Sequence, residues 1–85
     1  MDDRLALIGI IVQNEGSIPL LNEILHKYRD KIIGRMGLPS AREGISVISI
    51  VMSASGDEIS ALSGKLGQLG GVSAKAMFAK TEGGK

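Results

Sequence analysis

The chain has 85 residues, of which 44% are hydrophobic and 22% charged, and its formal net charge at pH 7 is +1. This composition is typical of one small folded domain, and the nearly balanced charge argues against direct nucleic-acid binding through general electrostatic attraction. The chain has no cysteine, which excludes disulfides and thiolate chemistry. No apolar run is long enough to span a membrane or resembles a signal peptide, so we expect a cytoplasmic protein with no membrane partner.

The first part of the chain predicts a strand followed by a helix. Residues 5–12 are a short isoleucine-rich run that ends before the turn formers Asn14 and Gly16. Ser17 is a candidate N-cap, and Ile18 begins an apolar stripe at helical spacing that ends near residue 29 or 30. We therefore expect the first helix to begin directly after the turn.

The remaining elements complete a ferredoxin-like pattern. Residues 31–38 are expected to form a strand that stops at Pro39, where a polar stretch begins. The later elements are a strand over 45–54, a helix that starts at residues 55–57 and ends before Gly70, and a strand over 72–79. The order βαββαβ predicts an α+β fold with a four-stranded antiparallel sheet and two helices on one face. One domain should span residues 1–80, and residues 81–85 should form a flexible C-terminal tail.

The strand predicted over residues 45–54 is apolar on both of its faces. One face carries Ile45, Val47 and Val51, and the other carries Ile48, Ile50 and Met52. A large apolar sheet face is rarely left in contact with water. We therefore expect a homodimer or homotetramer that associates through the sheet, with Ile48, Ile50 and Met52 as candidates for the contact surface.

Small residues line one side of the second predicted helix, at Ser60, Ser63, Gly64 and Gly67. A glycine inside a helix costs about 1 kcal/mol relative to alanine, so another group is expected to approach this backbone closely. Close packing within the fold or between subunits is favoured over a ligand groove.

Two places are candidates for binding a small ligand. The turn that contains Asn14, Gly16, Ser17 and Ile18 can present backbone N–H groups at a helix N-terminus, where a carboxylate or another small anion binds. Gly16 serves equally well as a plain turn residue. Arg35 can hold an anionic ligand or pair with a carboxylate across an interface. A solvated charge that keeps an edge strand from aggregating explains Arg35 at least as well.

The sequence contains no recognisable catalytic or metal-binding pattern. Glu23 and His26 have the spacing of a helical metal pair, but one chain supplies only these two ligands and solvated residues are the commoner case. Gly64-Lys65 lacks the rest of a phosphate-loop motif. Tyr28 and Phe78 are too few aromatic residues for stacking RNA bases. We therefore expect no metal, no cofactor and no enzymatic activity.

Four segments carry a resemblance to a known family: NEILH at 22–26, GRMGLP at 34–39, ISALSGKLGQ at 59–68, and Gly71-Val72 with Lys75. They resemble the small proteins described as regulators of the iron-only hydrogenase system, and the resemblance covers residues 5–80. This family is similar in fold to ACT domains and to the C-terminal domain of the nickel-responsive repressor. Those are βαββαβ modules that assemble through their sheets and bind small effectors.

The resemblance implies a single ACT-like domain with a regulatory function. Gly16 followed by Ser17 and Ile18 is similar to the glycine that ACT domains place after the first strand, which implies effector binding. One histidine and no cysteine depart from the metal site of the nickel-responsive repressor, and no residues remain for a DNA-binding domain. We expect a non-enzymatic, oligomeric, effector-binding module with a protein partner in hydrogenase regulation or maturation. The alternative is a ligand-free assembly or maturation factor that acts only by protein–protein interaction.

Overall fold

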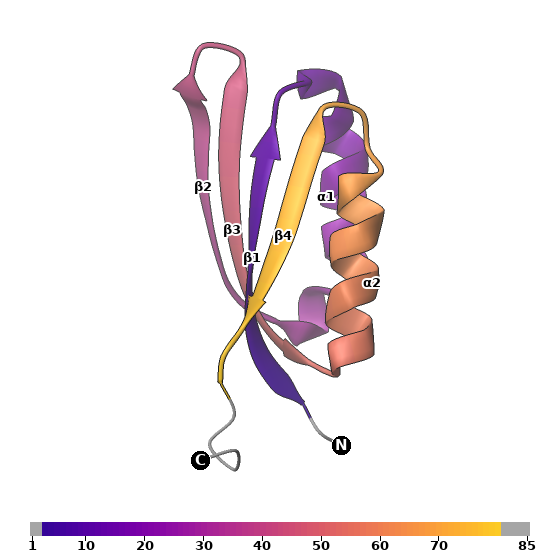
Figure 1. The fold of residues 1–85 in the computed structure, drawn as a ribbon. Helices are drawn as coiled ribbons and strands as arrows, with labels where there is room; N and C mark the ends of the chain where they lie inside the picture. Colours follow the sequence, from indigo (N-terminus) through magenta and orange to yellow (C-terminus); the bar gives the residue numbers. More distant parts are fainter. Residues whose placement is uncertain (1–2, 81–85) are drawn as a thin grey trace.

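The computed structural model describes residues 3–80, and the expected flexible tail at 81–85 lies outside the described residues. The described chain has the order βαββαβ, with a short 3₁₀ turn on either side of the first helix (Figure 1). The elements are β1 (Arg4–Val12), η1 (Glu15–Ser17), α1 (Ile18–Lys27), η2 (Arg29–Lys31), β2 (Ile32–Arg42), β3 (Ile45–Ala54), α2 (Gly56–Gly67) and β4 (Val72–Phe78).

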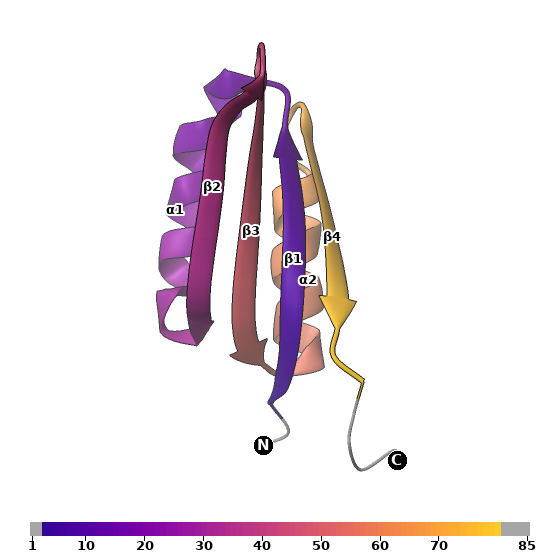
Figure 2. The same cartoon turned by 90° about the vertical axis from the view of Figure 1, so that its left-hand side faces the viewer.

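The four strands form one antiparallel sheet in the order β2-β3-β1-β4. Both helices cover the same face of this sheet and leave the other face open (Figure 2). This arrangement confirms the prediction of an α+β, ferredoxin-like fold. No helix within residues 3–80 has the length and apolar character needed to cross a membrane.

The core lies between the sheet and the two helices. In β1 and β3 every second residue is buried, and Ile8 pairs directly with Ile50 across the two strands. Leu21 and Leu25 of α1 and Ile59, Leu62 and Leu66 of α2 pack onto this face of the sheet. Full burial of such a side chain contributes roughly 1.5–3 kcal/mol, so this layer accounts for most of the favourable free energy of folding.

The prediction that Ile48, Ile50 and Met52 form a contact surface between subunits is wrong, because these three side chains belong to the core. Ile50 and Met52 are fully buried and Ile48 is 7% exposed. Alternation along a strand separates its two faces but does not say which face the helices will cover. The open face of β3 is the other one, which carries Ile45, Val47 and Val51.

β2 continues through Pro39 to Arg42, whereas the sequence predicted that it would stop at Pro39. The strand lies at the edge of the sheet, where proline is tolerated because a backbone nitrogen there can face away from the neighbouring strand. The pairing with β3 is irregular between Leu38 and Arg42, and Ser40 has a φ of 57°. The proline is thus accommodated by a local bulge on an edge strand.

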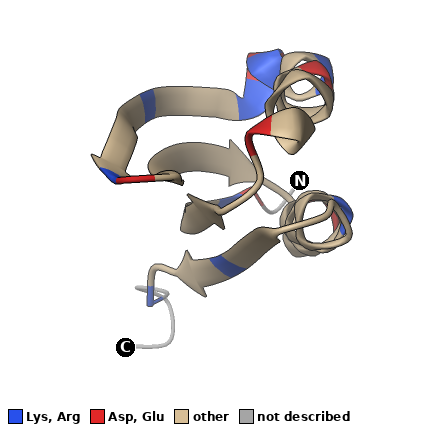
Figure 3. Cartoon of the chain, turned by 90° about the horizontal axis from the view of Figure 1, so that it is seen from above, with Lys and Arg blue, Asp and Glu red and all other residues tan. Residues whose placement is uncertain are grey.

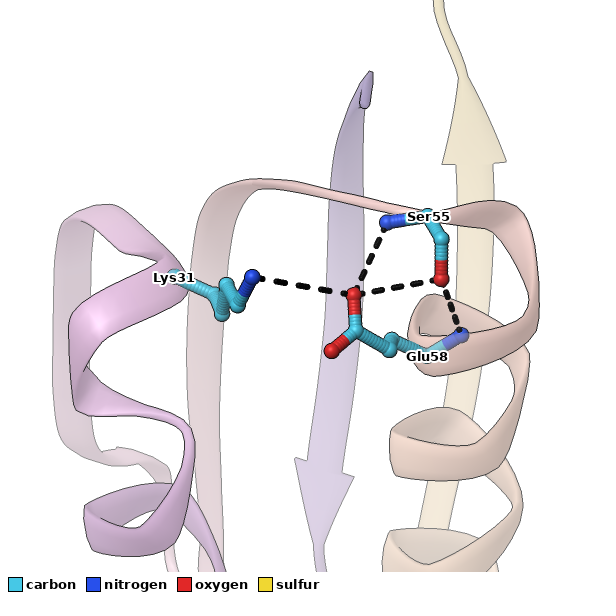
Figure 4. A network of polar contacts seen from close by, with 3 residues as sticks. All are labelled: Lys31, Ser55 and Glu58. Carbon is cyan, nitrogen blue, oxygen red and sulfur yellow. Dashed lines mark hydrogen bonds and ion pairs between the residues drawn. The ribbon is translucent and has the colours of Figure 1, made fainter. Parts of the chain in front are cut away.

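α2 begins where the sequence predicted a helix start, and a capping box stabilises this end. The Glu58 N–H donates to Ser55 Oγ at 3.1 Å, and the Ser55 N–H donates to Glu58 Oε1 at 3.0 Å. Lys31 Nζ lies 3.8 Å from the same carboxylate oxygen (Figure 4). The backbone and side-chain hydrogen bonds from Ser55 lower the pKa of Glu58. At its other end α2 stops at Gly67, two residues before the expected end at Leu69.

Candidate functional site

The turn between β1 and α1 uses its own backbone donors internally. Asn14 Oδ1 accepts the Gly16 N–H at 3.0 Å, and the Asn14 carbonyl accepts the Ser17 N–H at 2.9 Å. The Ile18 N–H donates to the Glu15 carbonyl. The anion site expected at these N–H groups is therefore not available in this conformation, because the Asn14 side chain occupies the place that an anion would take.

The same turn packs against the turn between α2 and β4. Ser17 is the N-cap residue of α1, as predicted. Its Oγ makes no capping hydrogen bond, however, and donates instead to the Gly70 carbonyl at 2.7 Å. The Gln13 N–H donates to the Gly71 carbonyl at 2.7 Å. Gly71 has a φ of 71°, and a Cβ at this position would lie 2.7 Å from the Asn14 Cβ. This junction joins the β1–α1 turn of the first half to the α2–β4 turn of the second.

Ile18 and Arg35 are the two predicted ligand residues that the fold brings to one hollow. This hollow, of about 170 Å³, lies between α1 and β2 and is also lined by Asn22 and Gly37. Arg35 NH2 donates to Asn22 Oδ1 at 2.7 Å across the hollow. Asn14, Gly16 and Ser17 do not line it.

A second hollow, of about 300 Å³, lies beside the first and shares Asn22 and Arg35 with it. Its other lining residues are Leu25, His26, Arg29 and Ile32. Sequence reasoning missed Asn22 and Arg29 as members of a site. The signal was present, because Asn22, His26 and Arg29 follow the i, i+4, i+7 spacing that places residues on one side of a helix.

The small-residue strip of α2 faces outward. A Cβ added at Gly64 or Gly67 would meet nothing within 4 Å in the described chain. Ser60 is exposed and Ser63 is half-buried. The prediction that these two glycines are closely packed within the fold is therefore wrong.

The open face of the sheet carries most of the exposed apolar surface. Leu7 pairs with Val51 on one side and with Met77 on the other, so these side chains share this face. The large apolar residues exposed here are Leu5, Leu7 and Ile11 of β1, Met36 and Leu38 of β2, and Met77 of β4. Two hollows of about 290 and 300 Å³ open on the face. Charged residues are sparse on the central strands (Figure 3).

His26 and Glu23 have the spacing of a helical metal pair in the sequence. Residues 3–80 contain no group of three or more His, Cys, Asp or Glu side chains that could hold a metal ion. His26 instead lines the α1–β2 hollow together with Arg29.

Three comparisons with known proteins bear on identity. Residues 4–76 match the model of the TM1266-like family, whose description is "Iron-only hydrogenase system regulator, putative". The structure of the uncharacterized protein TM1266 from Thermotoga maritima is 36% identical, with a TM-score of 0.87, and the match covers 93% of this chain and 100% of that one.

A second solved structure shares the fold at low sequence identity. The ACT domain of the GTP pyrophosphokinase of Chlorobium tepidum is 22% identical with a TM-score of 0.76, and the match covers 89% of this chain and 100% of that one. No curated protein matches the sequence. The match of the family model over residues 4–76 shows that the chain belongs to the TM1266-like family of iron-only hydrogenase system regulators.

Proposed function

We propose that this protein is a non-enzymatic regulatory module of the iron-only hydrogenase system that works as an oligomer and binds a small effector. The family description and the ACT-like fold support a regulatory, non-catalytic role. The observation that carries the proposal is the open sheet face, where Leu5 is 49% and Met77 65% exposed. An apolar face of this kind is stabilised when another protein surface covers it.

The simplest occupant of the face is a second copy of the same chain, which gives a two-fold dimer or a tetramer of such dimers. Met77→Lys tests this because burying the exposed 65% of Met77 contributes about 1–2 kcal/mol per copy. The substitution in both copies of a dimer therefore reduces the free energy of association by about 2–4 kcal/mol, which weakens the dimer at least about 30-fold. Sedimentation equilibrium should show that weakening for Met77→Lys.

Leu20→Lys is the matched control, because Leu20 is 52% exposed but lies on α1, away from the sheet face. It should leave the association constant unchanged. A wild-type protein that sediments as an 8.9 kDa monomer at micromolar concentration contradicts oligomerisation outright.

We place the effector between α1 and β2, where Ile18 and Arg35 line one hollow. A ligand that binds only the folded protein raises its melting temperature with concentration. A thermal-shift screen of amino acids, nucleotides and phosphorylated metabolites should therefore find at least one ligand. Arg35→Gln should reduce the shift.

A second candidate function is a ligand-free assembly or maturation factor that docks onto a hydrogenase-system protein. The occupied N–H groups of Gly16, Ser17 and Ile18 favour it, because they remove the expected anion site at that turn. The absence of any thermal shift across the screen, together with an intact oligomer, would support this function over effector binding.

A further inference from the structure

The surface between α1 and β2 is a groove on the helix-bearing side of the sheet. Every residue of β2 from Arg35 to Arg42 is exposed, so the helix does not seal this edge. The hollows of about 170 and 300 Å³ adjoin at the hydrogen bond between Arg35 and Asn22. The larger of the two is at the lower end of the size range of small-molecule pockets.

The larger hollow has an apolar side and a cationic rim. Leu25, 2% exposed, and the half-buried Ile32 provide the apolar side. His26 and Arg29 come from α1 and the turn that follows it. Arg35 comes from β2, where it pairs with Ile50 and so lies on the helix side of the sheet. Two guanidinium groups from separate elements therefore border one small space.

The hydrogen bonds of the rim leave mainly donors available. Asn22 Oδ1 already accepts from Arg35, and the His26 carbonyl accepts from Arg29 NH1 at 2.9 Å. Each guanidinium has five N–H donors, and only one of them is used in each of these two bonds. Across residues 3–80, neither arginine lies within ion-pair distance of a carboxylate. The missing partner is a group that only accepts hydrogen bonds and carries negative charge.

Arg29 and His26 also lie where basic residues offset the partial negative charge of a helix C-terminus. The negative charge at the helix C-terminus amounts to about half an elementary charge. The guanidinium groups of Arg29 and Arg35 together carry two full positive charges. Arg35 is on a strand and has no such role. The rim therefore keeps a net positive charge after the helix dipole is compensated.

We infer that this hollow binds a small phosphorylated molecule, with the phosphate between Arg29 and Arg35 and the apolar part against Leu25 and Ile32. A phosphate offers more acceptor oxygens than a carboxylate and carries a charge that matches two guanidinium groups. Sequence patterns did not indicate a phosphate loop, and the site does not need one, because side chains supply the donors. The inference rests on the proposed effector-binding function and names the chemical class of the effector.

The test is an NMR titration of the ¹⁵N-labelled protein with phenyl phosphate, inorganic phosphate and benzoate at constant ionic strength. We expect saturable binding of phenyl phosphate, with the largest shifts at the Asn22 side-chain amide and the Arg35 backbone amide. Inorganic phosphate should bind at the same place more weakly, because it lacks the apolar part. Benzoate should bind at least about tenfold more weakly than phenyl phosphate.

The double variant Arg29→Gln with Arg35→Gln should weaken phenyl phosphate binding by more than about tenfold. Arg42→Gln is the matched control for Arg35→Gln alone, since it removes one arginine charge from the same strand but lies outside the hollow, and it should leave the affinity unchanged. Equal losses in the control, shifts centred elsewhere, benzoate binding as tight as phenyl phosphate, or no saturation by about 10 mM would each overturn the site. If phenyl phosphate fails this test while the thermal-shift screen finds a neutral ligand, effector binding is upheld and this class of ligand is refuted.

Discussion

Replacing Gly71 by alanine should destabilise the protein strongly, for two separable reasons. The φ of 71° places an L-residue in the left-handed region, which costs about 1–2 kcal/mol. The new Cβ would lie 2.7 Å from the Asn14 Cβ and 3.1 Å from the Asn14 backbone nitrogen, and relieving that overlap costs roughly 1–3 kcal/mol more. We expect a total loss of about 2–5 kcal/mol, a large part of the stability of a small domain.

Two other glycines separate these contributions. Gly44 has a φ of 77° with nothing within 4 Å of its Cβ position, so Gly44→Ala should cost only the conformational part, about 1–2 kcal/mol. Gly64 is helical with nothing within 4 Å, so Gly64→Ala should stabilise the protein by up to about 1 kcal/mol. Urea denaturation followed by circular dichroism measures all three. If Gly71→Ala costs no more than Gly44→Ala, the contact with Asn14 has no energetic importance and the reasoning fails.

Three further predictions concern the core, the junction and the capping box. Ile50→Ala, at a fully buried site, should lower the free energy of unfolding by about 2–5 kcal/mol in the same denaturation assay. Leu5→Ala, on the open face, should lower it by less than half of that amount. Ser17→Ala removes the bond to the Gly70 carbonyl and should cost about 0.5–1.5 kcal/mol, and a neutral result would show that this bond is dispensable. Because hydrogen bonds from the Ser55 backbone and side chain lower the pKa of Glu58 in the folded state, the charged carboxylate stabilises the fold above the unfolded pKa. This stabilisation is lost as the pH falls through the folded pKa. The unfolding free energies of wild type and Glu58→Gln should thus differ at neutral pH and converge in acid, and a difference independent of pH would contradict the role of the charge.

Most of the fold followed from local patterns, because each helix and strand has a periodicity that its own residues determine. β3 illustrates both the strength and the limit of this reasoning. Its bounds, Ile45–Ala54, agree with the sequence, but the choice between its two apolar faces depends on where the helices pack. Pro39 shows the same dependence, since a proline that would break a central strand is tolerated on the edge strand that β2 turns out to be.

The candidate site was harder to predict because it is built from tertiary contacts. Ile18 and Arg35 were predicted as ligand residues from separate local arguments, and only the packing of α1 beside β2 brings them to one hollow. At the β1–α1 turn, the spacing of Asn14 and Gly16 did not reveal that the Asn14 side chain would accept the Gly16 N–H. The glycines of α2 were predicted to be closely approached by another group. The apolar stripe of Ile59, Leu62 and Leu66 places them on another side of the helix, and that side faces outward.

The central position of β1 has a consequence for how the chain folds during synthesis. β1 is made first, yet its two neighbours in the sheet, β3 and β4, begin at residues 45 and 72. Proteins dominated by such distant pairings fold slowly, on the scale of roughly milliseconds to seconds. The sheet cannot be completed until β4 has left the ribosome. Until then the apolar residues of β1 lack their final partners, and this is the stage at which the nascent chain is most exposed to aggregation.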